Sequence, residues 1–418
     1  MSTKITISFR SIISDFLFWG LCLSVILNMF DNTRYYIFQL IFIGIYLFIL
    51  GINGSLKILV DFIRKHLLLV LAFCAWTILA LFQSSIYSSL RILSFFALIF
   101  MGYLIVVKNQ LQGLVISLRR IGILLFISVL YGLVAFFLKT NPFMFLSERF
   151  ETYTRSFTRI TSVFVHPIPC ATFFIIALII ILTIGKNKIY TTIASIICLA
   201  GIIYTFSRSA WASALIVMLI IYYPKIKKLC VAHKLKKNTL IFLIIAFLGI
   251  CLLAIIYRNA LAETINLVVQ RLFKEDLSSD MSFTWRISSI GIIANQSINS
   301  GPVGFLFGHG VESGSQFLTR MHFGSLFSYN VGAVDNSYIS VLYDLGIVGL
   351  GFIIALIIVT AVLMFRFQNR YCKIISYIMI VLLIMAFFYE ELYWCNSGYL
   401  FFSFAGITIA LWDRRKIL

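Results

Sequence analysis

The segment NSYISVLYDLGIVGLGFIIALIIVTAVLMF, residues 336–365, carries a single charged side chain, that of Asp344. A helix needs about 20 consecutive apolar residues to cross the hydrocarbon core of a bilayer. This segment is longer than that, so it predicts a transmembrane helix. An acidic side chain is costly to expose to lipid, and we therefore expect Asp344 to face neighbouring helices.

The composition extends this prediction to the whole chain. Apolar residues make up 61% of the 418 positions and charged residues 12%, whereas a soluble domain is about half apolar and about a quarter charged. The apolar runs are long and continuous, unlike the short alternating segments of a β-barrel. The eight cysteines are scattered and form no CxxC or His–Cys cluster, so neither a disulfide framework nor a zinc site is expected.

Twelve apolar runs are candidate spans, and the first has no cleavage site of the kind that follows a signal peptide. They lie near 11–30, 35–52, 67–83, 90–107, 121–138, 167–185, 189–206, 209–223, 239–257, 336–365, 373–389 and 398–412. The sequence therefore predicts an all-α polytopic membrane protein with about twelve transmembrane helices. We expect residues 1–418 to form a single integral membrane domain.

Lys and Arg are enriched in cytoplasmic loops, and this bias sets the orientation. With the N-terminus inside, 22 of the 34 basic residues are cytoplasmic and 12 are outside. Both termini are then cytoplasmic, and the basic run KIKKLCVAHKLKK at 225–237 is a topology anchor instead of a nucleic-acid site. Two outer loops are long, at 139–166 and 258–335. The second has apolar residues at helical spacing, which predicts amphipathic helices on the membrane surface or over a cavity. These residues are Leu261, Ile265, Val268 and Leu272, and Phe283, Ile287, Ile290 and Ala294.

The outer basic residues differ in type from the inner ones. Ten of the twelve are Arg, whereas Lys outnumbers Arg by 14 to 8 on the cytoplasmic side. A guanidinium binds two phosphate oxygens at once and stays charged in a poorly hydrated site. This favours a phosphate or pyrophosphate ligand at the outer leaflet. The alternative is pairing with the outer acids Glu148, Glu151, Glu263, Glu275, Asp276, Asp280 and Glu312. The ten are Arg34, Arg91, Arg149, Arg155, Arg159, Arg208, Arg258, Arg271, Arg286 and Arg320.

Arg208 differs from the others because it lies in YTFSRSAWASALIV (204–217), with an apolar run on each side. An ionisable residue so close to lipid is a candidate for function. The alternative is that its side chain extends to the lipid headgroups.

Three motifs together resemble the Wzy-type family of O-antigen and capsular polysaccharide polymerases and O-antigen ligases. The first is RITSVFVHPIPCATFF (159–174), the second is YTFSRSAWASALIV (204–217), and the third combines GHGVES (308–313) with VDNSYISVLYDLGIVGL (334–350). Their order, their spacing and the long outer loop before the third resemble the family over roughly residues 140–365.

The resemblance implies an enzyme that handles sugars on undecaprenyl pyrophosphate at the outer face of the bacterial inner membrane. It implies metal-independent glycosyl transfer of the membrane glycosyltransferase (GT-C) type, without a cofactor. Arg208 and Arg286 would lie near the pyrophosphate, and Arg159 is a third candidate. The expected partners are the undecaprenyl-pyrophosphate-linked oligosaccharide, the lipid bilayer, and a chain-length regulator and flippase of the same pathway, with no nucleic acid.

One departure from the family bears on the reaction. Ligases typically place His before the Asn of the third motif, whereas here Asp335 precedes Asn336. This favours a polymerase, with an O-antigen ligase as the alternative. A non-catalytic flippase or other transporter of lipid-linked glycan is an alternative of a different class, but it should carry ionisable residues at the midplane of broken helices.

A glycosyl transfer also needs an acceptor for the proton of the incoming hydroxyl. Asp335 is the first candidate and His309 the second, although Asp-Asn-Ser before an apolar run is also typical of a helix N-cap. Glu390 and Glu391 are reserve candidates, and His166 before Pro167 is interpreted as a helix start. The glycines of GPVGFLFGHGVESG (301–314) either approach phosphate or form a flexible turn. Further substrate-binding candidates are Tyr338, Asn336 and Arg320.

Overall fold

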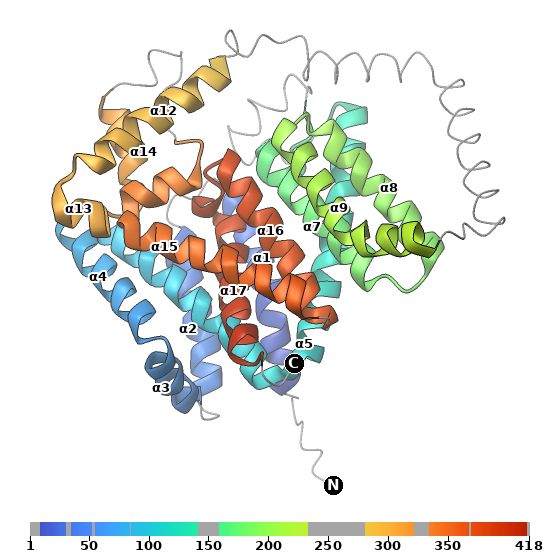
Figure 1. The fold of residues 1–418 in the computed structure, drawn as a ribbon, viewed down its shortest axis with the longest axis horizontal. Coiled ribbons are helices and arrows are strands. Elements are labelled where there is room, and N and C mark those ends of the chain that lie inside the picture. Colours follow the sequence, from blue (N-terminus) through green and yellow to red (C-terminus); the bar gives the residue numbers. More distant parts are fainter. Residues whose placement is uncertain are drawn as a thin grey trace.

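The computed structural model describes residues 9–30, 35–51, 55–83, 85–140, 159–232, 281–321, 334–367 and 369–415. Every regular element within these ranges is helical (Figure 1), so the predicted all-α class is confirmed for the described part of the chain. The elements are α1 (Phe9–Met29), α2 (Tyr35–Gly51), α3 (Ser55–Lys65), α4 (Leu67–Gln83), α5 (Ile86–Leu138), α7 (Pro167–Ile184), α8 (Lys188–Tyr204), α9 (Arg208–Ala232), α12 (Met281–Ile298), α13 (Gly301–Phe307), α14 (Ser313–Arg320), α15 (Ser337–Arg366), α16 (Arg370–Phe388), the short 3-10 helix η4 (Glu391–Tyr393) and α17 (Cys395–Asp413).

Six segments among the described residues are long and apolar enough to cross a membrane, or seven if the bent pair α3–α4 is one span. Four shorter apolar helices lie in α1, α2, α8 and α9. The helices occur where the apolar runs predicted them, and the predicted span at 239–257 lies outside the described residues. Large apolar side chains such as Leu68 and Phe82, each 85% exposed, cover the outside of the bundle. Such a surface suits lipid and not water, so the chain is a multi-pass membrane protein.

The loop predicted between the spans at 90–107 and 121–138 is wrong, because α5 continues through it as helix. The segment KNQLQGLVISLRR (108–120) contains no proline, and most of its residues are good helix formers. Two stretches of α5, Ile86–Lys108 and Gly113–Leu138, are each long enough to span the membrane. The correction therefore concerns the connection and not the two spans.

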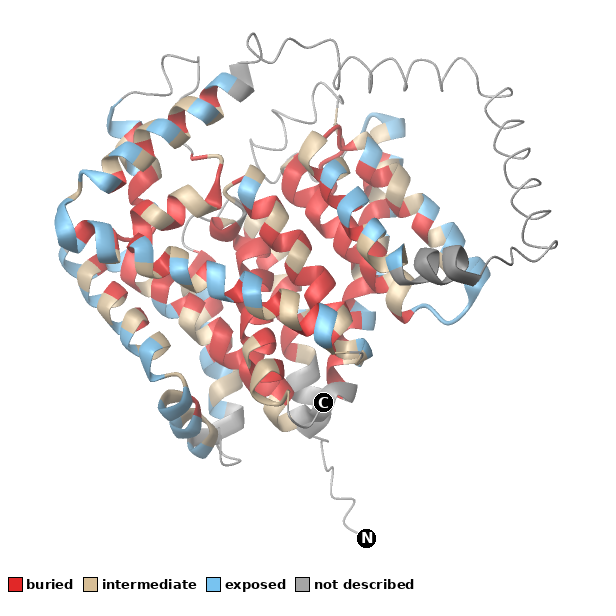
Figure 2. Ribbon diagram, in the orientation of Figure 1, coloured by how far each residue is buried: buried red, intermediate tan, exposed pale blue. Residues whose placement is uncertain are grey.

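The core lies where α16, α17, α7 and the first half of α5 meet. Figure 2 shows buried residues concentrated along these helices, whereas α4 and α8 carry many exposed ones. Gly102 on α5 and Gly406 on α17 allow the two helices to touch, because a Cβ on either would lie 1.9 Å from a backbone oxygen of the other helix. Close backbone approach at small residues is the usual way in which membrane helices pack.

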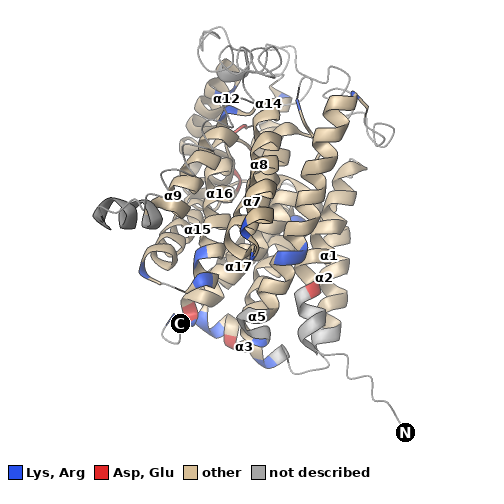
Figure 3. Cartoon of the chain, turned by 90° about the vertical axis from the view of Figure 1, so that its right-hand side faces the viewer, with Lys and Arg blue, Asp and Glu red and all other residues tan. Residues whose placement is uncertain are grey.

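One end of the bundle joins segments that the sequence assigns to the cytoplasm. His66 Nε2 lies 3.0 Å from Asp413 Oδ2, and Arg414 donates to the carbonyl of Val107 at 2.8 Å. Figure 3 shows Lys and Arg gathered toward this end, near α3 and the end of α17, with α12 and α14 at the opposite end.

The opposite end joins segments that the sequence assigns to the outer face. Asn28 Nδ2 donates to the carbonyl of Phe164 at 3.3 Å, and the Tyr35 hydroxyl donates to the carbonyl of Tyr393 at 2.7 Å. The predicted alternation of loops between two faces therefore agrees with the packing.

Within the second outer loop, the helix predicted around Phe283–Ala294 is present as α12. Its predicted apolar face is wrong, because Ile287 is 55% exposed while Trp285, Ser289 and Ile293 are buried. The two buried apolar residues pack with α14 and α15, in a small cluster that includes Tyr343. Burial against other outer elements has therefore overridden the spacing of the larger aliphatic residues. The predicted helix around Leu261–Leu272 lies outside the described residues.

Candidate functional site

The sequence left two roles open for Asp335, proton acceptor and N-cap of the following helix. The start of α15 distinguishes between them. The N-cap is Asn336, whose side-chain oxygen accepts from the backbone N–H groups of Tyr338 at 3.0 Å and Ile339 at 3.1 Å. Its amide nitrogen donates to the carbonyl of Phe387 at 2.9 Å, which fixes α15 to the end of α16. The cap interpretation of Asp335 is therefore wrong, and Asn336 is held as a structural residue instead of facing a ligand.

Asp335 forms an ion pair with Arg286. The Nε of Arg286, on the first turns of α12, lies 3.3 Å from Asp335 Oδ2. The Arg286 side chain is 33% exposed and that of Asp335 17%, so the pair is partly buried but accessible to a ligand. Burial raises the pKa of the Asp335 carboxyl, and the Arg286 guanidinium opposes that rise. The contact uses only Nε, and a guanidinium has two further nitrogens with which to bind an anion.

Arg159 and Arg208 meet at the turn between α8 and α9. Arg159 Nε donates to the carbonyl of Thr205 at 2.8 Å, and the N–H of Ile160 donates to the carbonyl of Tyr204 at 3.0 Å. Arg208 is the first residue of α9, only three positions beyond Thr205, and its side chain is partly exposed. Two of the three predicted phosphate-binding arginines therefore converge on one short turn.

The end of α16 connects this turn to the Asp335–Arg286 pair. The ring of His166, at the start of α7, stacks on Tyr389 with the centroids 4.9 Å apart. The Ser337 hydroxyl, two residues after Asp335, donates to the carbonyl of the same Tyr389 at 2.9 Å. Both α7 and α9 pack on α16. The structure therefore places both arginine groups at the same end of the bundle, next to the end of α16.

His166 itself is the N-cap of α7, accepting from the N–H of Ile168 at 3.3 Å, with Pro167 in the first turn. The interpretation of His166 as a helix start is confirmed.

Glu390 is a second carboxyl at this end. The Ser340 hydroxyl donates to Glu390 Oε1 at 2.9 Å, one turn into α15. Burial, followed by the charge of Asp344, raises the pKa of Glu390 well above its usual range. Glu390 therefore stays a reserve proton acceptor, while the side chain of Glu391 lies outside what the structure describes.

His309 lies in a segment whose backbone N–H groups bind carbonyl groups that a break in α15 leaves unpaired. We call this set of contacts the clamp. α15 breaks at Gly346, where φ is +69°, and the break leaves carbonyl groups without partners in their own helix. The N–H of His309 donates to the carbonyl of Tyr343 at 3.1 Å, and that of Gly310 donates to the carbonyl of Asp344 at 2.8 Å. Trp76 Nε1 donates to the next carbonyl, that of Leu345, at 2.9 Å. Gly308 and Gly310 thus approach the backbone of α15, so for these two glycines neither the phosphate loop nor the flexible turn is the right description.

Asp344 completes the clamp from inside the bundle. Its carboxyl group is buried, as expected, and accepts from the N–H groups of Glu312 at 2.7 Å and Gly314 at 2.9 Å. The His309 ring packs on Tyr343, with the centroids 4.7 Å apart, and burial lowers its pKa below the usual range. The His309 ring therefore packs beneath α13, and its role as the second candidate base stays a prediction.

Gly308→Ala tests the clamp. Gly308 has a φ of +75°, and an added Cβ would lie 2.3 Å from the carbonyl carbon and oxygen of Asp344. With a ψ of −165° as well, its backbone lies in a region that is essentially restricted to glycine, where another residue costs about 1–3 kcal/mol, and the clash adds to this. We expect the melting temperature of the purified protein to fall by several degrees. Gly351→Ala, at a helical position with open space around it, should leave the melting temperature almost unchanged. An unchanged value for Gly308→Ala would contradict the clamp.

Arg91 has a buried side chain and forms an ion pair with Glu312, whose side chain is half exposed. Its guanidinium contacts the carboxylate of Glu312 and donates to the Tyr35 hydroxyl and to the carbonyl of Tyr393. The Arg91 side chain is only 4% exposed. A signal was present, since Arg91 begins an apolar run much as Arg208 does. For Arg91 the alternative of pairing with an outer acid is therefore correct.

Two further candidates, Tyr338 and Arg320, donate to backbone carbonyls. The Tyr338 hydroxyl donates to the carbonyl of Leu383 at 2.8 Å, so its ring faces α16. Arg320 is exposed at the end of α14, and its Nε donates to the carbonyl of Gln316 at 3.4 Å. Among the described residues, no three His, Cys, Asp or Glu side chains gather in a way that could hold a metal ion. The other predicted outer arginines, Arg34, Arg149, Arg155, Arg258 and Arg271, lie outside the described residues.

Comparison with known proteins finds a family that matches the part of the chain that carries most of the candidate site. Residues 193–354 match the family model Wzy_C, described as O-antigen ligase. The matched range contains Arg208, Arg286, His309 and Asp335, and it begins after Arg159. The match confirms the family resemblance over the second and third motifs, and the first motif, 159–174, lies outside the matched range. A comparison with curated proteins found no match.

Proposed function

We propose that this chain, whose residues 193–354 match a family model described as O-antigen ligase, is a polysaccharide polymerase. It transfers a growing O-antigen or capsule glycan from undecaprenyl pyrophosphate to the non-reducing end of the next lipid-linked repeat unit. The observation that carries the proposal is the Asp335–Arg286 pair at 3.3 Å. It holds a carboxylate and a guanidinium at the end of the bundle that also carries Arg159 and Arg208.

These residue types match the needs of the reaction. The acceptor hydroxyl oxygen forms a bond to the anomeric carbon of the donor, while the bond from that carbon to the pyrophosphate oxygen breaks. The leaving undecaprenyl pyrophosphate keeps the electron pair, and its charge is met by Arg208, Arg286 and Arg159 without a metal ion. The hydroxyl proton passes to Asp335 as general base. Arg286 can serve both groups, because its Nε contacts Asp335 and its other nitrogens remain to bind phosphate.

The polymerase is favoured over the ligase by one residue. Asp335 stands where ligases of the family typically carry His, and its N-cap role is excluded by Asn336. The name of the matched family, O-antigen ligase, favours the alternative, an enzyme that transfers glycan to lipid A core. A non-catalytic flippase is supported less well, because Asp344 is engaged by two backbone amides and does not line an open path.

The proposal includes a topology. The chain has twelve spans in a single GT-C-like membrane domain in the bacterial inner membrane, with both termini in the cytoplasm. The site then faces outward, where the lipid-linked oligosaccharide is available. A chain-length regulator and a flippase of the same pathway are the proposed protein partners.

Arg286→Gln tests the Asp335–Arg286 pair through pH. A base must lose its proton to act, so kcat/KM rises with pH through the pKa of Asp335. The Arg286 cation lowers that pKa; with glutamine the pKa rises, and the acidic limb of the residual activity should move to higher pH. Arg286→Lys keeps the charge and should leave the limb closer to its original place. An acidic limb that does not move in Arg286→Gln would exclude Asp335 as the titrating base.

Deleting the gene in its host tests the function. A polymerase mutant should carry surface chains that end after a single repeat unit. Long polymer that accumulates on the lipid carrier and never reaches lipid A would overturn the proposal and establish the ligase. Repeat units trapped on the cytoplasmic side of the membrane would establish the flippase.

A further inference from the structure

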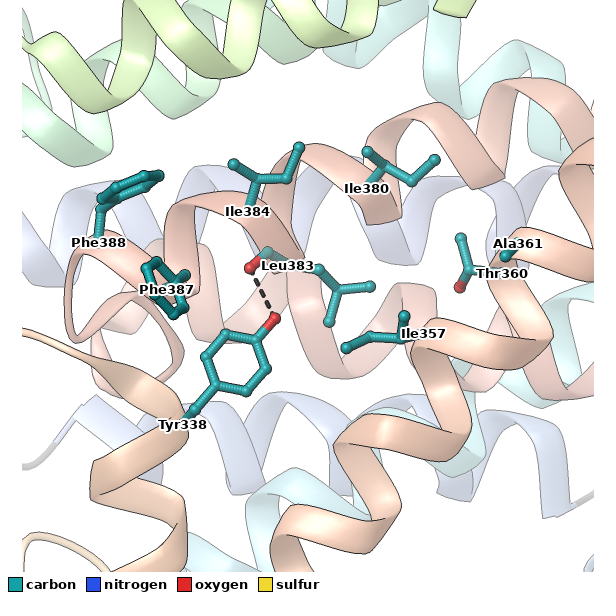
Figure 4. Close-up of a pocket in the computed structure, with 9 residues that line it drawn as sticks. All are labelled: Tyr338, Ile357, Thr360, Ala361, Ile380, Leu383, Ile384, Phe387 and Phe388. Carbon is teal, nitrogen blue, oxygen red and sulfur yellow. Dashed lines mark hydrogen bonds between the residues drawn. The ribbon is translucent and has the colours of Figure 1, made fainter. Parts of the chain in front are cut away.

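An apolar groove runs between α15 and α16 with a cavity volume of about 410 Å³ (Figure 4). Tyr338, Phe387 and Phe388 line it at the end near the site, and Thr360, Ala361 and Ile380 line it farther along. The volume falls within the range of about 300–1,000 Å³ that is typical of small-molecule pockets. Along α16 the lining extends from Phe388 to Ile380, which corresponds to about 12 Å at about 1.5 Å per residue.

The groove begins next to the proposed site. Tyr338 lies three positions after Asp335, and the wall at Phe387 is fixed to Asn336 by the 2.9 Å hydrogen bond to its carbonyl. Among the described residues that line this end, Tyr338 alone carries a polar side-chain atom, and its hydroxyl already donates to the carbonyl of Leu383 (Figure 4). A lipid whose pyrophosphate contacts Arg286 would therefore enter the groove with the first part of its tail.

We propose that the α15–α16 groove binds the first isoprene units of the donor's polyprenyl tail. This rests on the proposed function, because that function supplies a polyprenyl pyrophosphate. The groove is much shorter than an undecaprenyl chain, so the rest of the tail stays in the bilayer. Only the units nearest the pyrophosphate are fixed, and these are the ones that determine how the reacting carbon–oxygen bond is oriented.

One feature of the lining favours an isoprenoid over a saturated acyl chain. Ala361 lies beside Ile357 and Ile380, and its small side chain leaves space for the methyl branch that each isoprene unit carries.

The groove contributes mainly by positioning the tail and adds little binding free energy. Lipid tails are as apolar as the groove, so moving the chain from bilayer to groove gains packing but little from the hydrophobic effect. We therefore expect filling the groove to weaken the reaction of a prenyl donor by about three- to tenfold, which corresponds to about 0.7–1.4 kcal/mol. A donor with a straight saturated tail, which gains little from the groove, should react at a rate that filling does not change.

Ala361→Phe fills the groove, and Ile358→Phe is the matched control, because Ile358 is 58% exposed on the same helix and does not line the groove. Protein in nanodiscs is photolabelled with a polyprenyl monophosphate that carries a diazirine on its second isoprene unit. We expect labelling at Ile357–Ala361 and Ile380–Ile384, reduced several-fold by Ala361→Phe and unchanged by Ile358→Phe. Unlabelled polyprenyl pyrophosphate should compete, and phosphatidylethanolamine should not.

Labelling spread over all lipid-facing helices, or unaffected by Ala361→Phe, would overturn the groove proposal. Competition by phosphatidylethanolamine would assign the groove to bulk acyl chains and overturn it as well. The labelling does not depend on turnover. Groove labelling in a protein without polymerase activity would contradict the proposed function alone, and polymerase activity with labelling elsewhere would contradict the groove alone.

Discussion

Asp335→Asn is expected to lower kcat by about two to four orders of magnitude, the usual contribution of a positioned general base. The substitution leaves the fold in place for two reasons. The cap of α15 is supplied by Asn336 and not by Asp335, and the asparagine oxygen can still accept from Arg286 Nε. The rate of glycan extension by purified protein measures the effect, and the melting temperature shows whether folding is retained.

Asp413→Asn is the matched control for this experiment. It makes the same chemical change in an ion pair, with His66 at 3.0 Å, at the opposite end of the bundle. Its activity should stay close to that of the unchanged protein. If Asp335→Asn keeps full activity, Asp335 is not the base, and His309 and then Glu390 become the candidates.

Arg208→Lys is expected to lower kcat by about one to two orders of magnitude, and Arg208→Ala by about two to three. Lysine keeps the charge but loses the planar fork that binds two phosphate oxygens at once. The side chain is partly exposed at the start of α9, so neither change should empty a buried site. The comparison therefore measures phosphate binding and not folding.

Arg120→Lys provides the control, because Arg120 forms an exposed ion pair with Asp15 at the other end of the bundle. Its activity should be unchanged. Near-normal activity of Arg208→Lys would show that a point charge is sufficient and would rule out bidentate contact at this position. Near-normal activity of Arg208→Ala would remove Arg208 from the site.

The helices were predictable because a continuous apolar run in a chain of this composition has few other structures available. The burial of Asp344 followed from the same cost of exposing charge to lipid. The connection at 108–120 was not predictable from hydropathy, since polar residues are compatible with helix as well as with loop. Which face of α12 is buried depends also on the side chains of α14 and α15 against which it packs. The periodicity of α12 alone does not reveal those contacts.

The candidate site was predictable in its residue types more than in its contacts. Arg159 and Arg208 were identified from their motifs, but only the fold shows that both belong to the turn at Thr205. The sequence could not show whether Asp335 or Asn336 caps α15, because both residue types are good N-caps and they lie one position apart. The role of Gly308–Gly310 depended on the break at Gly346, which lies 36 positions later in the chain.

The most direct test of the central claim uses purified protein in nanodiscs with undecaprenyl-pyrophosphate-linked repeat units as the only substrate. The account predicts a ladder of polymers that stay attached to the lipid carrier, with one free undecaprenyl pyrophosphate released for each bond formed. It also predicts that the ladder disappears in Asp335→Asn. A protein that forms no glycosidic bond until lipid A core is added, and then transfers the repeat unit to it, would contradict the account.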